Sequence, residues 1–226
     1  MMPAPIPRPA QALIDEAINA TLEAAASRAR LPAGPVGRCA DYAIVGAKLL
    51  TLLTSQPYRP VGGGGVVDCG QGRRIVLQPS RTSRRSARKL SQLNSYHCWI
   101  RGSHFRDSDT FFEEIVDFTL RHDSLVAQQY GQPFLRVDTP DFLWEAFPGG
   151  TPTKKGAAIR PGDMPGEAET HWEIPEIVQL VMQYERDFNP LFESLAAQAM
   201  GQLAELIDAR KLQRQNDAGE GQPTLA

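Results

Sequence analysis

Three short stretches set the architecture of this chain: Gly37-Arg38-Cys39-Ala40, His97-Cys98-Trp99-Ile100 and Ile115-Val116-Asp117-Phe118-Thr119. The first opens a run of apolar residues at helical spacing, whereas the other two are short and rich in β-branched and aromatic residues, as strands are. We therefore expect a helix that begins near Cys39, followed along the chain by two strands that carry His97 and Asp117.

The 226 residues, with 42% apolar content and a net charge of −2, are typical of one globular domain with a sizeable core. The apolar stretches are far shorter than the roughly 20 residues that span a bilayer, and the start of the chain does not resemble a signal peptide. The charge balance indicates neither a nucleic-acid nor a membrane partner. These features predict a cytoplasmic protein.

The periodicity of apolar residues and the positions of Pro and Gly divide the chain into segments. The middle of the chain has the short apolar runs of an antiparallel sheet, and the helical patterns lie before and after it. The expected segments are an extended arm at 1–10, a helical part at 11–54, the sheet at 61–120, a lid-like or disordered loop at 148–170, two helices at 174–213 broken near Asn189-Pro190, and a frayed tail at 214–226.

Cys39 is the candidate nucleophile because of its position at a helix start. A free thiol has a pKa near 8.5, but a helix amino terminus and an imidazolium partner lower that value to roughly 3.5–7.5. The unpaired amide of the same residue can also face a developing oxyanion. Cys69 and Cys98 are expected to be core thiols, since three cysteines without paired spacing do not indicate disulfides.

His97 and Asp117 are the candidate base and its orienting partner. Alternation along a strand places His97 and Trp99 on one face and Cys98 on the other. The Asp117 carboxylate lies in an apolar run, where a buried charge requires a partner, and an imidazole nitrogen is suitable. Such a pairing fixes the tautomer of the base, as the third member of a catalytic triad does.

These residues resemble the core of the transglutaminase-like branch of the papain-like cysteine enzymes, of the bacterial type, over about 31–120. The resemblance implies an α+β fold in which a nucleophile helix packs on an antiparallel sheet, with extra helices at both ends. It also implies that Cys39 is the nucleophile, His97 its base and Asp117 the orienting residue, while Trp99 corresponds to an aromatic residue at the substrate site. Members of this family act on amide, peptide or related acyl substrates through a thioester, without metal or cofactor.

The sequence leaves other functions open. The chain is expected to be a thiol-dependent hydrolase or acyl-transfer enzyme, but a non-catalytic binding or assembly module with the same fold is an alternative. An acyltransferase of the arylamine N-acetyltransferase type is another. The helices at 174–213 are candidates for homo-oligomer contacts. A second oxyanion donor is unidentified, because Leu31-Pro32-Ala33-Gly34-Pro35 contains no glutamine.

Two further motifs have simple structural interpretations. The glycines at Gly62–Gly65 are expected to form a flexible lead-in to a strand, because no phosphate-binding pattern follows them. The basic run Arg81–Lys89 is expected to be a solvated loop, since no aromatic residues are interleaved with it. No Cys-x-x-Cys or His-x-His spacing indicates a metal site.

Overall fold

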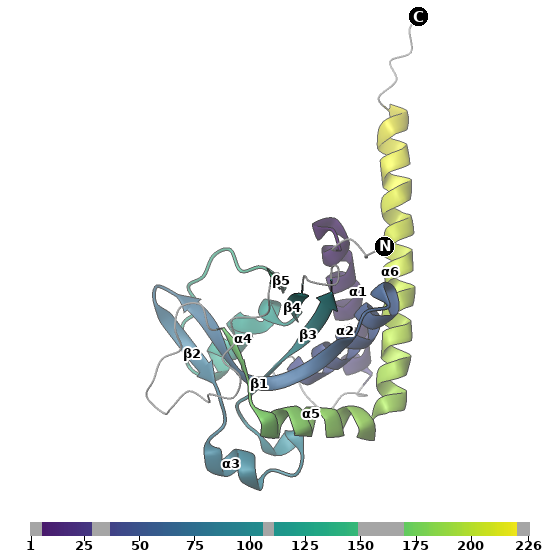
Figure 1. The fold of residues 1–226 in the computed structure, drawn as a ribbon. Coiled ribbons are helices and arrows are strands. Elements are labelled where there is room, and N and C mark those ends of the chain that lie inside the picture. The colour runs from purple at the N-terminus through teal and green to yellow at the C-terminus, as the bar shows by residue number, and fades with distance from the viewer. Residues whose placement is uncertain (1–5, 29–36, 106–110, 149–169, 221–226) are drawn as a thin grey trace, which may run out of the picture.

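The computed structural model describes residues 6–28, 37–105, 111–148 and 170–220, and it has the α+β fold expected from the sequence (Figure 1). Its antiparallel sheet has the strand order β2-β1-β3-β4-β5, and β6 pairs with β1. The strands are β1 (Tyr58–Gly70), β2 (Arg73–Leu77), β3 (His97–Phe105), β4 (Phe111–Asp117), β5 (Leu143–Pro148) and β6 (His171–Glu173). The helices are α1 (Arg8–Ser27), α2 (Cys39–Thr54), α3 (Arg81–Ser86), α4 (Asp123–Gln129), α5 (Pro175–Asp187) and α6 (Asn189–Glu220), with short 3-10 turns at Leu90–Gln92 and Leu120–His122.

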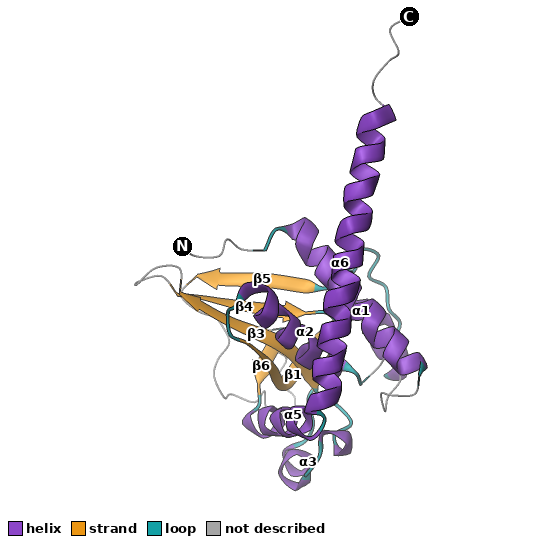
Figure 2. Cartoon of the chain, turned by 90° about the vertical axis from the view of Figure 1, so that its right-hand side faces the viewer, coloured by secondary structure: helices purple, strands orange, loops and turns teal. Residues whose placement is uncertain are grey.

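Helix α2 lies against the sheet and is covered on its other side by α1 and α6 (Figure 2). The sequence of α2 is apolar on most sides, which suits a helix buried between two layers. Ile44 and Leu50 of α2 are buried in one cluster with Ile100 and Phe118 of the sheet layer. Burial of each such side chain contributes about 1.5–3 kcal/mol, so this interface holds the start of α2 against the strands.

The opposite face of the sheet carries a smaller apolar cluster formed by Val61, Trp99 and Ile115. Trp99 and Ile100 therefore point to opposite faces, as strand alternation requires. Cys39 packs on the face of the sheet that carries Ile100, whereas Trp99 lies on the opposite face.

Several boundaries differ from the expected ones. Helix α1 begins at Arg8, inside the segment expected to be an extended arm, because Pro9 falls in the first turn, where its missing amide is tolerated. Helix α6 continues to Glu220, so the expected frayed tail is helical over 214–220. Its polar residues there include good helix formers. The expected loop at 148–170 falls almost wholly on residues 149–169, which lie outside the described part of the chain.

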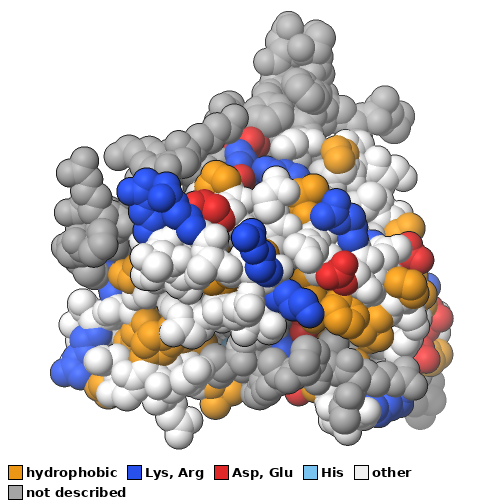
Figure 3. Space-filling view, turned by 90° about the horizontal axis from the view of Figure 1, so that it is seen from below, with side chains coloured by type: hydrophobic (Ala, Val, Ile, Leu, Met, Phe, Trp, Pro, Cys, Tyr) orange, Lys and Arg blue, Asp and Glu red, His pale blue; other side chains and the backbone are white. Residues whose placement is uncertain are grey.

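The basic run also differs from the expectation, because Arg81–Ser86 forms the short helix α3 rather than a loop. Ser80 caps it by accepting a hydrogen bond from the Ser83 amide at 3.1 Å. Arg81 and Arg85 are exposed. On the face seen in Figure 3, Lys and Arg side chains are spread over the surface with Asp and Glu among them.

The described helices contain no segment with the length and hydrophobicity needed to cross a bilayer. Helix α6 extends well beyond the sheet layer (Figure 1). Ile207 and Leu212 are exposed on it. Association of two copies through the C-terminal helices stays a prediction.

The four glycines of Gly62–Gly65 lie inside β1, not in a flexible lead-in, and they are required by close packing. Gly63 pairs with Glu173 of β6, and a Cβ atom on Gly63 would lie 1.9 Å from the Trp172 carbonyl oxygen. No side chain can occupy that space without moving the backbone of β6. The glycine run therefore allows β6 to add to the sheet at this point.

We expect Gly63→Ala to destabilise the protein by about 1–3 kcal/mol, because the added methyl group overpacks the contact between β1 and β6. Gly201→Ala is the matched control, since a Cβ on Gly201 of α6 would meet nothing within 4 Å. That control should gain about 0.5–1 kcal/mol from helix propensity. Thermal unfolding followed by circular dichroism measures both changes. Equal stability of the wild type and Gly63→Ala would contradict this account of the glycine run.

Candidate active site

Cys39 is the first residue of α2, and two neighbours fix this end of the helix. Gly37 has a φ of 101°, a left-handed conformation that favours glycine. The buried Arg38 side chain donates hydrogen bonds to the Leu22 carbonyl oxygen at 3.2 Å and to Glu23 Oε1 at 2.8 Å, both on α1. The Cys39 thiol and amide therefore lie at the positive end of a firmly held helix.

His97 and Asp117 meet at one end of the sheet. Strands β3 and β4 are antiparallel neighbours, so the first residue of β3 and the last residue of β4 lie close together. The distance between His97 Nε2 and Asp117 Oδ2 is 2.6 Å. The carboxylate that the sequence placed in an apolar run thus has the imidazole partner that its burial requires.

The Asp117 carboxylate is 2% exposed and accepts four hydrogen bonds. Its Oδ1 atom accepts from the Thr119 amide at 2.9 Å and from the Thr119 hydroxyl at 2.6 Å. Its Oδ2 atom is shared by His97 Nε2 and, at 3.1 Å, by His171 Nε2. Two carboxylate oxygens offer about four acceptor positions, so the protein itself satisfies this charge.

His171 is a site residue that the sequence did not indicate. It is the first residue of β6, and it pairs with Gly65 of β1. A strand of three residues is too short for the alternation of apolar and polar residues to be recognised. The only signal was the short run His171-Trp172-Glu173 after a long segment rich in Pro and Gly.

Trp99, expected at the substrate site, is 1% exposed and packs against both histidines. Its ring is nearly parallel to that of His97, with centroids 6.2 Å apart and an interplanar angle of 19°. The Trp99 and His171 ring centroids are 5.1 Å apart. Trp99 thus supports the imidazole rings from within the protein, while a contact with substrate stays a prediction.

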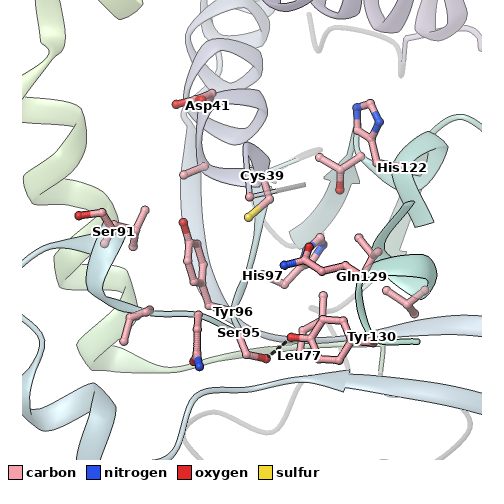
Figure 4. A pocket seen from close by; sticks show the side chains of 18 of the residues that line it. Cys39, Asp41, Leu77, Ser91, Ser95, Tyr96, His97, His122, Gln129 and Tyr130 are labelled. Carbon is pink, nitrogen blue, oxygen red and sulfur yellow. Dashed lines mark hydrogen bonds between the residues drawn. The ribbon is translucent and has the colours of Figure 1, made fainter. Parts of the chain in front are cut away.

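A cavity of about 410 Å³ opens beside Cys39 (Figure 4). The Cys39 sulfur points from the start of α2 into the space between His97 and Tyr96. A second cavity, of about 490 Å³, is lined by His97 together with Asp117 and His171. His97 therefore borders both cavities.

The contacts of His97 determine which of its nitrogens can serve Cys39. An ionised carboxylate can only accept, so His97 Nε2 carries the proton that it shares with Asp117. In the neutral ring, Nδ1 is then an acceptor. This is the tautomer that a base needs to take a proton from a thiol.

The pKa of Cys39 is lowered to about 6. The largest cause is a hydrogen bond from the Cys98 thiol; burial opposes it, and the contact with His97 lowers the pKa further. Burial and the contact with Cys39 raise the pKa of Cys98 well above its usual range, so Cys98 stays a neutral donor. The sequence predicts that Cys98 is a core thiol, and Cys98 is both buried and in contact with the candidate nucleophile.

The three residues of the hydrogen-bonded cluster have different protonation states. Burial alone would lower the pKa of His97, but the charge and hydrogen bond of Asp117 raise it well above 6.5. Burial alone would raise the pKa of Asp117, but the two histidines hold it well below its usual range. Burial lowers the pKa of His171, against the effect of Asp117. At neutral pH the cluster therefore holds a carboxylate, an imidazolium and a neutral imidazole.

The same cluster is the group of side chains that could hold a metal ion in the described part of the chain. The donor atoms of His97, Asp117 and His171 lie within 4.8 Å of one another. Two imidazoles and one carboxylate suit Zn²⁺ or another divalent transition metal. Each donor atom is also satisfied by direct hydrogen bonds within the cluster, so the geometry does not require an ion.

Comparisons with known proteins do not identify a family. No protein-family model matches the chain, and no curated protein matches it. A crystal structure described only as a genomics target is similar at 16% sequence identity with a TM-score of 0.49, covering 86% of this chain and 78% of that one. A likeness at this level supports no inference about function.

We expect Asp117→Asn to lower the pKa of His97 by about 1–3, because burial then acts on the imidazolium without its main counter-charge. Titration of the imidazole signals by NMR measures this change directly. His122, whose pKa burial lowers, is the internal comparison, whereas the pKa of His171 should also fall because His171 loses the same partner.

Asp123→Asn is the matched control for that titration. Asp123 is a carboxyl group that lines both cavities, and burial raises its pKa to about 7. No hydrogen bond joins it to His97 among the described residues, so its removal should move the His97 titration much less. Equal effects of the two substitutions would contradict the assigned role of Asp117.

Proposed function

We propose that this protein is a thiol-dependent hydrolase or acyl-transfer enzyme with Cys39 as nucleophile, His97 as base and Asp117 as orienting residue. One observation carries the proposal. Cys39, at a helix amino terminus, shares a cavity with the ring of His97, whose far nitrogen is hydrogen-bonded to a buried carboxylate. A thiol with these neighbours is an activated nucleophile.

The arrangement also supports a papain-like or transglutaminase-like core. The nucleophile helix packs on an antiparallel sheet, and the base and its partner come from two neighbouring strands that follow it in the chain. Fold alone does not determine function, so the proposal depends on the site.

The reaction proceeds by acyl transfer through a thioester. The Cys39 thiolate attacks the acyl carbon; a C–S bond forms, and the carbonyl π electrons move to oxygen. When this tetrahedral intermediate collapses, the C–N bond breaks, and the His97 imidazolium gives its proton to the leaving amine. Neutral His97 then removes a proton from water or an acceptor amine, which attacks the thioester carbon. The C–S bond breaks, the acyl product leaves, and the Cys39 thiolate and the His97 imidazolium are restored. Asp117 remains ionised throughout and holds the His97 ring in position.

The oxyanion of the tetrahedral intermediate has two candidate donors. The Cys39 amide lies in the first helical turn, where amides lack an intrahelical acceptor. The Tyr96 ring stands beside Cys39 in the same cavity (Figure 4). Its hydroxyl makes no hydrogen bond with a described residue, and burial raises its pKa, so it stays protonated and able to donate. We propose Tyr96 as the second donor, a role that the sequence left unassigned.

The cavity supports an acyl substrate of moderate size. A volume of about 410 Å³ is within the range of small-molecule sites, and it also suits one or two residues of a peptide. Its walls combine apolar side chains such as Leu77 and Leu93 with the phenol rings of Tyr130 and Tyr184. The acyl group therefore lies against a mostly apolar wall, and the amide or ester carbonyl faces Cys39.

Alkylation by iodoacetamide across pH tests the nucleophile. With a Cys39 pKa of about 6, the rate should reach its plateau near pH 7 and fall to half near pH 6. An ordinary thiol is only about one-hundredth ionised at pH 6.5. In His97→Ala, the midpoint should rise, because the imidazolium partner is gone while the Cys98 thiol still donates to Cys39. Peptide mapping by mass spectrometry assigns the modified residue.

Cys69 and Cys98 are internal controls in this experiment. Both are buried, and burial raises their pKa values, so they should stay unmodified in the folded protein. The catalytic proposal fails if Cys39 reacts no faster than a free thiol below pH 7 and His97→Ala leaves its rate unchanged.

Acylation by p-nitrophenyl acetate tests Tyr96. We expect Tyr96→Phe to slow acetylation of Cys39 by about 10²–10³, the usual effect of losing an oxyanion donor. Alkylation by iodoacetamide should change little, because displacement at an sp³ carbon forms no oxyanion. Tyr130→Phe is the matched control: it removes a phenol that lines the same cavity and donates to Ser95 Oγ at 2.9 Å. If Tyr96→Phe is acetylated at the wild-type rate, Tyr96 is not the donor.

A further inference from the structure

His171 occupies a position that the proposed triad does not use. Its Nε2 atom is 3.1 Å from Asp117 Oδ2, the same oxygen that His97 Nε2 approaches to 2.6 Å. Because an ionised carboxylate can only accept, His171 Nε2 carries a hydrogen and donates it. Two imidazoles therefore compete for one carboxylate oxygen.

The tautomer of His171 is fixed from its other side. The Thr170 hydroxyl oxygen lies 2.9 Å from His171 Nδ1. In a neutral imidazole that donates from Nε2, the Nδ1 atom is an acceptor, so the hydroxyl of Thr170 donates to it. A chain of hydrogen bonds thus runs from Thr170 through His171 to Asp117 and then to His97.

The backbone holds His171 at this oxygen. Strand β6 is joined to β1 through the pairs Gly65–His171, Gly64–Trp172 and Gly63–Glu173. A Cβ atom on Gly65 would lie 2.9 Å from the Cβ, Cγ and Cδ2 atoms of His97. The glycine run thus brings β6 and the His97 ring to the same small space, and the Trp99 ring packs against both imidazoles.

We propose that His171 is a positioning residue that acts on His97 through Asp117. The Nε2–H group of His171 donates a hydrogen bond to the same oxygen of Asp117 that accepts from His97. This second hydrogen bond weakens the interaction between the carboxylate and the His97 proton. His97 can then release its proton to a leaving amine and return to the neutral form that activates water or an acceptor amine. The effect of His171 on catalysis rests on the proposed function, whereas its effect on the protonation of His97 does not.

Removal of the donor should therefore make His97 more basic. Thr119 still holds Asp117 Oδ1 through two hydrogen bonds, so loss of His171 does not free the carboxylate to rotate. The less solvated carboxylate then stabilises the imidazolium more strongly. The titratable groups that face His97 are Cys39 from α2, Asp117 from β4, Asp123 from α4 and His171 from β6. Glu145 of β5 also faces His171.

The experiment uses a Cys39→Ala background, in which His97 titrates without a thiol neighbour and no activity is needed. In His171→Phe, which fills the space but donates no hydrogen bond, the NMR titration midpoint of His97 should rise by about 1 pH unit. In His171→Gln, whose amide nitrogen can reach the same oxygen, it should stay near the parent value. Thr170→Val should raise the His97 midpoint by less. It tests the chain of hydrogen bonds from Thr170 to His97 if His171→Phe does not fold.

A kinetic measurement connects the titration to turnover. In the protein with Cys39 intact, hydrolysis of the acetyl-enzyme requires neutral His97 as base. His171→Phe should move the pH midpoint of this step upward by about 1 and slow it about tenfold at neutral pH. His171→Gln should restore most of the rate, which a merely structural role of His171 would not explain.

The outcomes separate this inference from the proposed function. If wild-type Cys39 is activated but His97 titrates alike in the parent, His171→Phe and Thr170→Val proteins, the inference is overturned and the triad stands. If the titration moves as expected while Cys39 shows ordinary thiol reactivity, the interaction is real and the proposed function fails. Stoichiometric Zn²⁺ binding by the Cys39→Ala protein that is lost in His171→Phe would make His171 a metal ligand and overturn the positioning role.

Discussion

The buried carboxylate of Asp117 is the group on which the arrangement of the site depends. A charge that is 2% exposed is stable only when its oxygens are hydrogen-bonded, and here one residue of its own chain segment and two histidines satisfy it. This requirement joins β3, β4 and β6 at one end of the sheet. It also fixes the orientation of the His97 ring, which leaves Nδ1 as the nitrogen that can serve Cys39.

The surrounding fold keeps these groups in register. The antiparallel pairing of β3 with β4 brings His97 to Asp117, and the pairing of β1 with β6 brings His171. The glycines of β1 leave room for β6, and Arg38 ties the start of α2 to α1. Cys39 is thus held by helix packing, while its partners are held by the sheet. The cavity lies where the two layers meet.

Much of the fold was predictable because its elements have long periodic patterns. The apolar spacing that follows Cys39 indicated α2, and the pattern after residue 174 indicated two helices separated at Asn189-Pro190. The pairing of His97 with Asp117 was predictable from the cost of an unpartnered charge in an apolar strand. The helix at Arg81–Ser86 was not predictable from periodicity, because a serine cap and not an apolar stripe stabilises it. The packing of the glycine run was not predictable, because its partners in β6 lie more than a hundred residues further along the chain.

The order of residues along the chain was enough to predict the α+β class, the helix that begins at Cys39 and the pairing of His97 with Asp117, because these follow from local periodicity and from the energetics of buried charge. The contacts of His171, Cys98 and Tyr96 with the site depended on three-dimensional packing. Such contacts have no local signature: a three-residue strand shows no alternation, and a thiol that looks like core becomes a hydrogen-bond donor only when a second thiol is folded against it.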